Sequence, residues 1–297
     1  MNNNITELSN RFTVPGIKFI AGTLPVIEIT NSFASAKIAL HGAHVMSYTP
    51  AGATDLLWMS DASWFEPNKP IRGGIPVCWP WFGGHPTDAN QPSHGFARIS
   101  EWQLECVELA DNGAHRIVLG LSDSEITRKM WDFAFKAELT VTVGAELHVE
   151  LMMRNCDAQP FTISAALHNY FAVDDITQVK VSGLVDCPYL DTVDNQRKEQ
   201  VGDIGFAAET DNVYLDTAAT AIIHDAAQQR KISIAKRGSN STVVWNPWSA
   251  KATRMPDFGN NEYTQMLCVE TTNAENDART IAPGAEHRLE TIISLLK

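Results

Sequence analysis

Two ionisable side chains, about a hundred positions apart, stand in stretches of the chain that are otherwise apolar. His168 lies in the run Ser-Ala-Ala-Leu-His-Asn-Tyr-Phe, and Glu270 lies in the run Met-Leu-Cys-Val-Glu-Thr-Thr-Asn. Burying an ionisable group without a partner costs several kcal/mol, so two such groups indicate a functional site. An imidazole and a carboxyl that face each other can act as a general acid and a general base. The pair therefore points to an enzyme that moves protons.

The residues around His168 alternate in polarity, which predicts a strand over residues 161–170. One face of this strand would be apolar. The other would be small and polar and would end in His168 and Tyr170. Such a face suits the floor of a polar cleft. The alternative is a core histidine whose hydrogen bonds are satisfied.

The same alternation places Glu270 on one strand face with Met266, Cys268 and Thr272. Glutamate is rarely buried without a partner, so a glutamate among apolar neighbours indicates a specific role rather than an ordinary exposed side chain. The alternative is a structural buried ion pair. Burial raises the pKa of a carboxyl and a neighbouring cation lowers it, so the sequence leaves the pKa of Glu270 open.

Arg72 begins a short motif that also contains two glycines, Gly73 and Gly74. The glycines let the backbone approach a ligand closely, and the guanidinium offers a planar fork of donors to an oxyanion. The alternative is a tight turn with an exposed arginine. A nucleotide phosphate loop is excluded, because Ile75 and Pro76 stand where such a loop needs Lys followed by Ser or Thr.

Three further places carry candidate binding residues. In the segment 93–98, which begins with Ser93, His94 could donate to a substrate hydroxyl and Arg98 could bind an anion, although a structural role is equally open. Asp211 could orient substrate hydroxyls or pair with an arginine, and the alternative is a solvated turn. Trp245 could stack on a substrate ring, but core packing is the more common use of tryptophan.

His41 and His44 are spaced like a metal-binding pair, but this spacing on a strand turns the two rings to opposite faces. No third ligand is evident near them. We therefore expect no metal site.

The composition limits the class of protein. The chain has 297 residues, is 44% hydrophobic and carries 23 basic against 35 acidic side chains, for a formal net charge of −12. This balance argues against nucleic acid and against an anionic membrane surface as partners. A small anionic ligand stays possible, because charges more than about 8 Å away are screened and local arginines can dominate.

The five cysteines are odd in number and include no Cys-x-x-Cys, so neither a disulfide framework nor a thiolate zinc site is indicated. The N-terminus lacks a basic region followed by an apolar core, and no stretch approaches the roughly 20 apolar residues of a membrane span. We expect a soluble, cytoplasmic protein with reduced cysteines.

Period-two patterns dominate the chain and predict an all-β fold, a large antiparallel β-sandwich with few short helices. The clearest pair is 133–143 and 147–153, joined by a hairpin turn at Gly144-Ala145. Further strands are expected at 26–30, 35–40, 116–121, 178–182, 221–224, 231–236, 242–245, 265–270 and 288–295. No linker divides the chain. The region 60–91 is rich in Pro, Gly and Trp and reads as a long functional loop.

The motifs occur in an order that resembles a known family. They are Arg-Gly-Gly-Ile-Pro from Arg72, Cys-Trp-Pro-Trp-Phe-Gly from Cys78, His-Gly-Phe-Ala-Arg from His94, Leu-His-Asn-Tyr-Phe from Leu167, Thr-Asp from Thr210 and Val-Glu-Thr from Val269. From about residue 25 to the C-terminus, the chain resembles the glucose-6-phosphate 1-epimerase branch of the aldose 1-epimerase family.

The resemblance implies a galactose-mutarotase-like β-supersandwich at 25–297, preceded by an N-terminal extension at 1–24, with no metal or organic cofactor. It implies that His168 is the general acid and Glu270 the general base, converging on opposite sides of one pyranose. Sugar phosphate would be held by Arg72 and Arg98. The residues that line the substrate would be Ser93, His94 and Asp211. Two positions depart from the usual pattern: Asn169 stands in place of Thr, and Asn212 in place of Arg.

The expected function is interconversion of the α and β anomers of a hexose 6-phosphate, with glucose 6-phosphate as the expected substrate. The reaction needs only proton transfer, and we expect the protein to be a monomer. One alternative is an aldose 1-epimerase for unphosphorylated sugars. Another is a non-catalytic carbohydrate-binding protein on the same fold. A metal-dependent isomerase is the least favoured.

Overall fold

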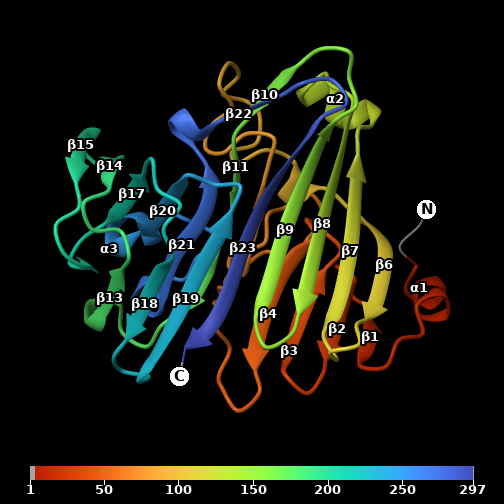
Figure 1. The fold of residues 1–297 in the computed structure, drawn as a ribbon, viewed down its shortest axis with the longest axis horizontal. Helices are drawn as coiled ribbons and strands as arrows, with labels where there is room; N and C mark the ends of the chain where they lie inside the picture. Colours follow the sequence, from red (N-terminus) through yellow and green to blue (C-terminus); the bar gives the residue numbers. More distant parts are fainter. Residues whose placement is uncertain (1–3, 297) are drawn as a thin grey trace.

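Antiparallel strands are the main regular structure of the protein and form four sheets in the part of the chain that the structure describes (Figure 1). The structure is a computed structural model that describes residues 4–296. The largest sheet has nine strands in the order β16-β13-β18-β19-β23-β9-β8-β7-β6. The second has eight strands, in the order β15-β14-β17-β20-β21-β11-β5, with β12 also paired to β21. The expected antiparallel β-sandwich with few short helices is confirmed.

The strands have the following bounds. The nine-stranded sheet contains β6 (Gln103–Leu109), β7 (His115–Ser122), β8 (Phe135–Val143), β9 (Leu147–Asn155), β13 (Val179–Ser182), β16 (Ile204–Gly205), β18 (Ala221–Asp225), β19 (Arg230–Arg237) and β23 (Glu286–Leu296). The eight-stranded sheet contains β5 (Val77–Cys78), β11 (Ala165–Leu167), β12 (Tyr170–Ala172), β14 (Pro188–Asp191), β15 (Gln196–Glu199), β17 (Thr210–Tyr214), β20 (Ser241–Asn246) and β21 (Met266–Asn273).

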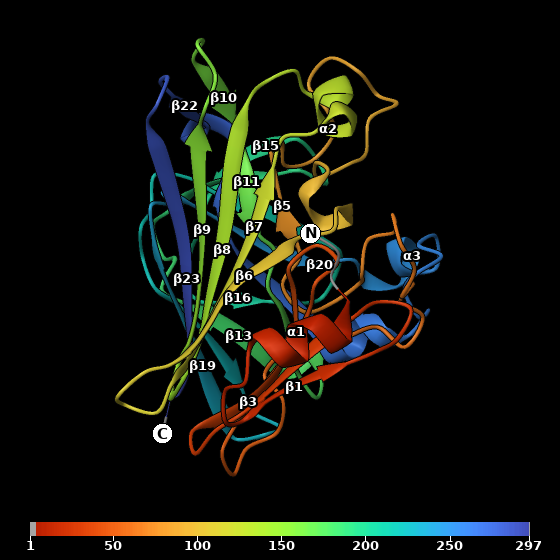
Figure 2. The same cartoon turned by 90° about the vertical axis from the view of Figure 1, so that its right-hand side faces the viewer.

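The smaller elements complete the fold. A four-stranded sheet contains β1 (Ile17–Ile20), β2 (Val26–Thr30), β3 (Ala34–Ala39) and β4 (His44–Pro50), and β10 (Phe161–Ile163) pairs with β22 (Arg279–Ile281). The helices are α1 (Ile5–Arg11), α2 (Glu125–Met130) and α3 (Trp248–Ala252). Figure 2 shows these three helices on one side of the nine-stranded sheet. None of the helices in residues 4–296 has the length and apolarity that crossing a membrane requires.

The β8–β9 hairpin shows how directly the alternating pattern determines a strand. Buried and half-buried residues alternate without a break along β8. The register pairs Phe135 with Asn155 and Val143 with Leu147, which places the turn at Gly144, as expected from the sequence. Apolar side chains of one β8 face therefore enter the core, and the polar ones stay at the surface.

The single strand expected over residues 161–170 is wrong, because the structure divides this segment into β10, β11 and β12. At Ser164 the backbone N–H donates to the carbonyl of Pro80. The hydroxyl of the same residue accepts from the backbone N–H of Phe82. These bonds take the chain away from β22 and onto β21, so the segment changes sheets before it reaches His168.

The eight-stranded sheet has two differently used faces. Val244, Leu267 and Val269 point into the main core. Alternate residues such as Trp245 and Cys268 belong to a second, smaller cluster on the opposite face. Polar side chains on this second face therefore border a region that is only partly filled by apolar groups.

Residues 5–20 of the expected N-terminal extension are built into the fold through α1 and β1. Strand β1 pairs with β2 along its full length. Leu8 of α1 is buried in the main core. These contacts attach α1 and β1 to the edge of the four-stranded sheet.

Candidate active site

His168 and Glu270 are in direct contact in the structure. The Nε2 atom of His168 lies 3.4 Å from Oε1 of Glu270, and the two residues are 7% and 1% exposed. They meet because β11 and β12, on either side of His168, both pair with β21, which carries Glu270. The contact also corrects one expectation: no pyranose fits between the two groups, so they can reach only the same edge of a sugar.

Burial controls the protonation of this pair. It lowers the pKa of His168 well below the usual value, with smaller contributions from nearby His94, Arg72 and Arg98. It raises the pKa of Glu270 well above the usual value, and the charge of Asp211 adds to that effect. Burial therefore favours a neutral imidazole beside a protonated carboxyl. The imidazolium–carboxylate form differs from this state by the position of one proton.

Aromatic rings fix the orientation of the imidazole. The ring of His168 stacks on Tyr170 with centroids 4.6 Å apart and planes 9° apart. Tyr170 stacks in turn on Trp58 at 5.7 Å. Within residues 4–296, Nδ1 of His168 and Oε2 of Glu270 are buried without a hydrogen-bond partner. The histidine ring is therefore held by packing, and these two atoms remain free to bind a ligand.

Arg72 is fixed by a buried carboxylate, and the alternative of an exposed turn arginine is wrong. Its Nε and Nη2 atoms donate to Asp257 at 3.1–3.2 Å, and Nη1 donates to the hydroxyl of Tyr170 at 3.0 Å. Gly73 and Gly74 are needed for this geometry, because both have positive φ and a Cβ would come within 2.4 and 2.2 Å of backbone carbonyl oxygens. Sequence reasoning missed Asp257. The only indication of such a residue was the general rule that a buried arginine needs an anionic partner.

Removing the partner of Arg72 should destabilise the protein. Asp257 is 3% exposed, so replacing Asp257 by Ala leaves a largely buried guanidinium without its counter-ion. We expect the free energy of unfolding to fall by about 3 kcal/mol, measured by urea denaturation. The matched control is Asp132→Ala, which removes an exposed partner of Arg128 and should change stability by less than about 1 kcal/mol. Equal effects in the two variants would contradict this role.

His41 and His44 support the loop that carries Arg72. The Nε2 atom of His41 lies 2.7 Å from the carbonyl oxygen of Lys69, and that of His44 lies 2.8 Å from the carbonyl oxygen of Gly73. A ring N–H that donates to each carbonyl explains both contacts. The two histidines therefore anchor the loop at two points.

The burial of His44 predicts a loss of stability in mild acid. Burial lowers the pKa of His44 to about 3, against the opposing effect of its bond to Gly73. A histidine in the unfolded chain titrates near 6.5, so below that pH the unfolded chain binds a proton that the folded protein does not. The stabilisation is complete above about pH 6.5 and falls by about 1.4 kcal/mol per pH unit on acidification.

Urea denaturation between pH 7 and 5 checks this slope. His44→Gln keeps a donor for the carbonyl of Gly73 and removes the titrating group. Below pH 6.5, the free energy of unfolding of this variant should fall less steeply with acidification than that of the wild type. The two slopes should differ by about 1.4 kcal/mol per pH unit. Parallel pH curves for the two proteins would contradict the assignment.

Arg98 carries a cation that no carboxylate neutralises within residues 4–296. Its Nη2 atom donates to the carbonyl of Ser93 at 2.7 Å, and its Nε atom is buried without a partner. His94 lies between these residues with a φ of 62°, and its Nδ1 accepts from the backbone N–H of Gly83. That bond places the proton of the neutral ring on Nε2. The segment therefore presents an imidazole donor and an uncompensated guanidinium together.

Asp211 lies on β17 and is paired with a lysine that sequence reasoning missed. Nζ of Lys251 lies 3.2 Å from Asp211 and 3.0 Å from Glu209. Asp211 and Val213 face the cavities of the site, whereas Asn212, between them, lines neither. An arginine in place of Asn212 would therefore point away from the site. The presence of Asn212 instead of Arg therefore does not remove a cation from the cavity. Lys251 contributes a cation of its own.

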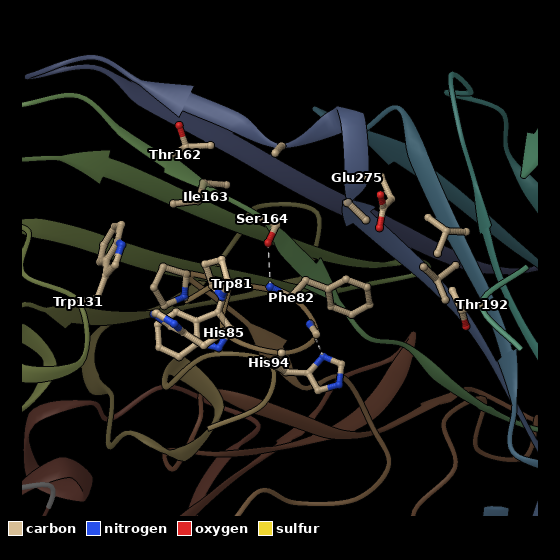
Figure 3. A pocket seen from close by; sticks show the side chains of 18 of the residues that line it. Trp81, Phe82, His85, His94, Trp131, Thr162, Ile163, Ser164, Thr192 and Glu275 are labelled. Atoms are coloured by element: carbon tan, nitrogen blue, oxygen red, sulfur yellow. Dashed lines mark hydrogen bonds between the residues drawn. The ribbon is translucent and has the colours of Figure 1, made fainter. Parts of the chain in front are cut away.

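All seven candidate residues line one cavity of about 300 Å³. They are Arg72, Ser93, His94, Arg98, His168, Asp211 and Glu270, and the remaining lining residues are Phe82, Val243, Trp245, Lys251 and Met255. A wider cleft of about 740 Å³ adjoins this cavity and shares part of its lining. In Figure 3, Trp131 and Thr162 lie at one end of that cleft and Glu275 and Thr192 at the other. A small polar ligand fits the cavity.

The fold is an antiparallel β-sandwich, and a carboxyl and an imidazole in contact line its cavity. Residues 25–294 match the family model described as Aldose 1-epimerase. The chain therefore belongs to the aldose 1-epimerase family.

Individual relatives agree with this placement. A Salmonella typhimurium protein provisionally named glucose-6-phosphate 1-epimerase is 39% identical over 254 residues, which is 84% of each chain. An Escherichia coli protein with the same provisional name is 36% identical, over 91% of this chain and 90% of that one. A crystal structure of a provisionally named mutarotase from Salmonella typhimurium has a TM-score of 0.90 at 34% identity, covering 96% of this chain and 95% of that one.

Proposed function

We propose that the protein interconverts the α and β anomers of a hexose 6-phosphate, with glucose 6-phosphate as the expected substrate. The observation that carries the proposal is the His168–Glu270 contact at the floor of a cavity that also holds Arg98 without a carboxylate partner. The provisional names of the relatives support the same substrate class. An aldose 1-epimerase for unphosphorylated sugars is the second candidate.

The reaction needs one proton removed and one supplied at neighbouring oxygens. Glu270, as carboxylate, takes the proton of the C1 hydroxyl while His168, as imidazolium, gives its proton to the ring oxygen. The C1–O5 bond opens to the free aldehyde. Rotation about C1–C2 presents the other face of the carbonyl, and reverse transfers close the ring. Because O1 and O5 are bonded to the same carbon, an acid and a base in contact can serve both.

The resting pair holds the single proton that this scheme requires. Burial directs that proton towards Glu270, whereas ring opening starts with it on His168. The two forms differ only by a transfer between atoms 3.4 Å apart. A sugar hydroxyl that donates to Glu270 would favour the carboxylate and so the form that starts the reaction.

The phosphate is held chiefly by Arg98 in this proposal. The charge of Arg72 is balanced by Asp257, and that of Lys251 is shared by Asp211 and Glu209. Arg98 has no such partner among the described residues, so it gains most from an incoming anion. Arg72 then contributes a fixed donor to the same cavity.

Polarimetry of freshly dissolved α-glucose 6-phosphate tests the proposal. We expect the protein to speed the approach to anomeric equilibrium above the rate of the sugar phosphate alone, and to do so more efficiently than it does for glucose. A preference for glucose would favour the second candidate. No acceleration of either sugar would contradict catalysis.

A further inference from the structure

A third side chain able to bind metal lies beside the catalytic pair. Cys268 precedes Glu270 by two residues on β21, so both point to the same face of the sheet. One ligand atom from each of His168, Cys268 and Glu270 lies within 4.8 Å of the other two. Cys268 is fully buried. His168 and Glu270 transfer protons in the proposed reaction, whereas Cys268 takes no part in it.

The three donors form a set that Zn²⁺ uses in proteins. An imidazole nitrogen, a thiolate sulfur and a carboxylate oxygen can occupy three positions of a tetrahedral site and leave the fourth open. Two of the residues, His168 and Glu270, line the cavity, which gives an ion a route to the cluster. Nδ1 of His168 and Oε2 of Glu270 are buried without hydrogen-bond partners within residues 4–296. The carboxylate therefore has a free oxygen to offer, and the neutral imidazole offers the lone pair of one ring nitrogen.

The ligands themselves carry the charge that balances a divalent cation. The Glu270 carboxylate and a Cys268 thiolate would together neutralise the two positive charges of the ion, while His168 binds as neutral imidazole. Arg72 nearby is balanced by Asp257, whereas Arg98 in the same cavity has no carboxylate partner among the described residues, so the attraction for the ion comes from its own ligands. Buried charges in proteins are typically paired or coordinate a metal, and this cluster would do both. Both acidic ligands must lose a proton on binding, so affinity should rise with pH.

We propose that His168, Cys268 and Glu270 form an inhibitory site for a thiophilic divalent cation, with Zn²⁺ as the ion it would take. The inhibitory effect rests on the proposed function, since the ion would occupy the acid and the base of anomer exchange. Binding itself does not depend on that function.

Two measurements on the full chain test the site. The first is titration of the metal-free protein with Co²⁺, in which a thiolate ligand gives a near-ultraviolet charge-transfer band. The second is anomer exchange of glucose 6-phosphate at buffered free Zn²⁺. We expect the wild type to show the band and to lose activity as free Zn²⁺ rises. Absence of both effects would overturn the proposal.

Cysteine variants separate this site from other modes of inhibition. Changing a residue that only supports a metal ligand already costs about 10- to 100-fold in affinity. Cys268→Ala should therefore weaken Zn²⁺ inhibition at least about tenfold, abolish the band and keep exchange activity without the ion. The control is Cys78→Ala, which removes a buried cysteine outside the cluster and should leave inhibition unchanged. Unaltered inhibition in Cys268→Ala would overturn the proposal.

A second variant covers the case in which Cys268→Ala does not fold. Cys268→Ser keeps a side chain of similar size, should abolish the Co²⁺ band and should weaken Zn²⁺ binding measured by calorimetry. Wild-type Zn²⁺ affinity in this variant would overturn the site. A cysteine-dependent Co²⁺ band in a protein that exchanges no sugar phosphate would instead leave the metal site in place and reject the proposed function.

Discussion

Replacing His168 by Ala, or Glu270 by Gln, should lower the rate of anomer exchange by about 10²- to 10⁴-fold, because each change removes one positioned proton-transfer group. The two groups touch at 3.4 Å and share one proton, so they act as a unit. The double variant should therefore be hardly slower than the worse single variant. The measurement is kcat for glucose 6-phosphate by polarimetry or exchange NMR.

Matched controls distinguish chemistry from a general loss of structure. His148→Gln and Glu146→Gln change a histidine and a glutamate that form a partly exposed pair and do not line the cavity, and both should keep wild-type rates. Circular dichroism and calorimetric binding of the sugar phosphate should show that the His168 and Glu270 variants still fold and bind. Near wild-type turnover in either catalytic variant would reject its assigned role.

Replacing Arg98 by Ala should raise the KM for glucose 6-phosphate by about 10- to 100-fold and change the kinetics for glucose little. A hydrogen bond to a charged group contributes about 1.5–3 kcal/mol, and this guanidinium has no competing carboxylate within residues 4–296. Arg98→Lys keeps the charge but loses the planar fork, so it should restore only part of the phosphate preference. The measurement is the ratio of kcat/KM for the two sugars.

Arg72 provides the comparison for this prediction. Arg72→Ala removes a cation that Asp257 already balances, and it also leaves that buried carboxylate without its partner. We therefore expect a smaller selective loss for the phosphorylated sugar and a larger loss of stability than in Arg98→Ala. An unchanged preference for glucose 6-phosphate in Arg98→Ala would contradict the phosphate role.

The parts of the fold that follow from local alternation could be predicted. The β8–β9 hairpin and the common face of Cys268 and Glu270 depend only on neighbouring residues in sequence, and both agree with the structure. The break of residues 161–170 could not be predicted in this way. It depends on one bond that Ser164 donates to Pro80 and one that it accepts from Phe82, and both partners are distant in sequence.

The candidate site shows the same division between local and distant causes. Ordered motifs and the family resemblance named the seven residues that line the cavity. They did not reveal the two side chains that set the charges of the site, Asp257 on Arg72 and Lys251 on Asp211. Both come from the segment between β20 and β21, and of the two only Lys251 lines the cavity. Only the general requirement that buried charges be balanced indicated that Arg72 and Asp211 have counter-ions, and it did not indicate which residues these are.

Two-dimensional exchange NMR of equilibrated glucose 6-phosphate tests the central claim most directly, since it follows the C1 protons of both anomers as they interconvert. With catalytic amounts of wild-type protein we predict exchange cross-peaks that build up much faster than in buffer alone. The variant that carries both His168→Ala and Glu270→Gln should return the build-up to the buffer rate. Buffer-level exchange with the wild type, or fast exchange with the double variant, would contradict ring opening by this pair.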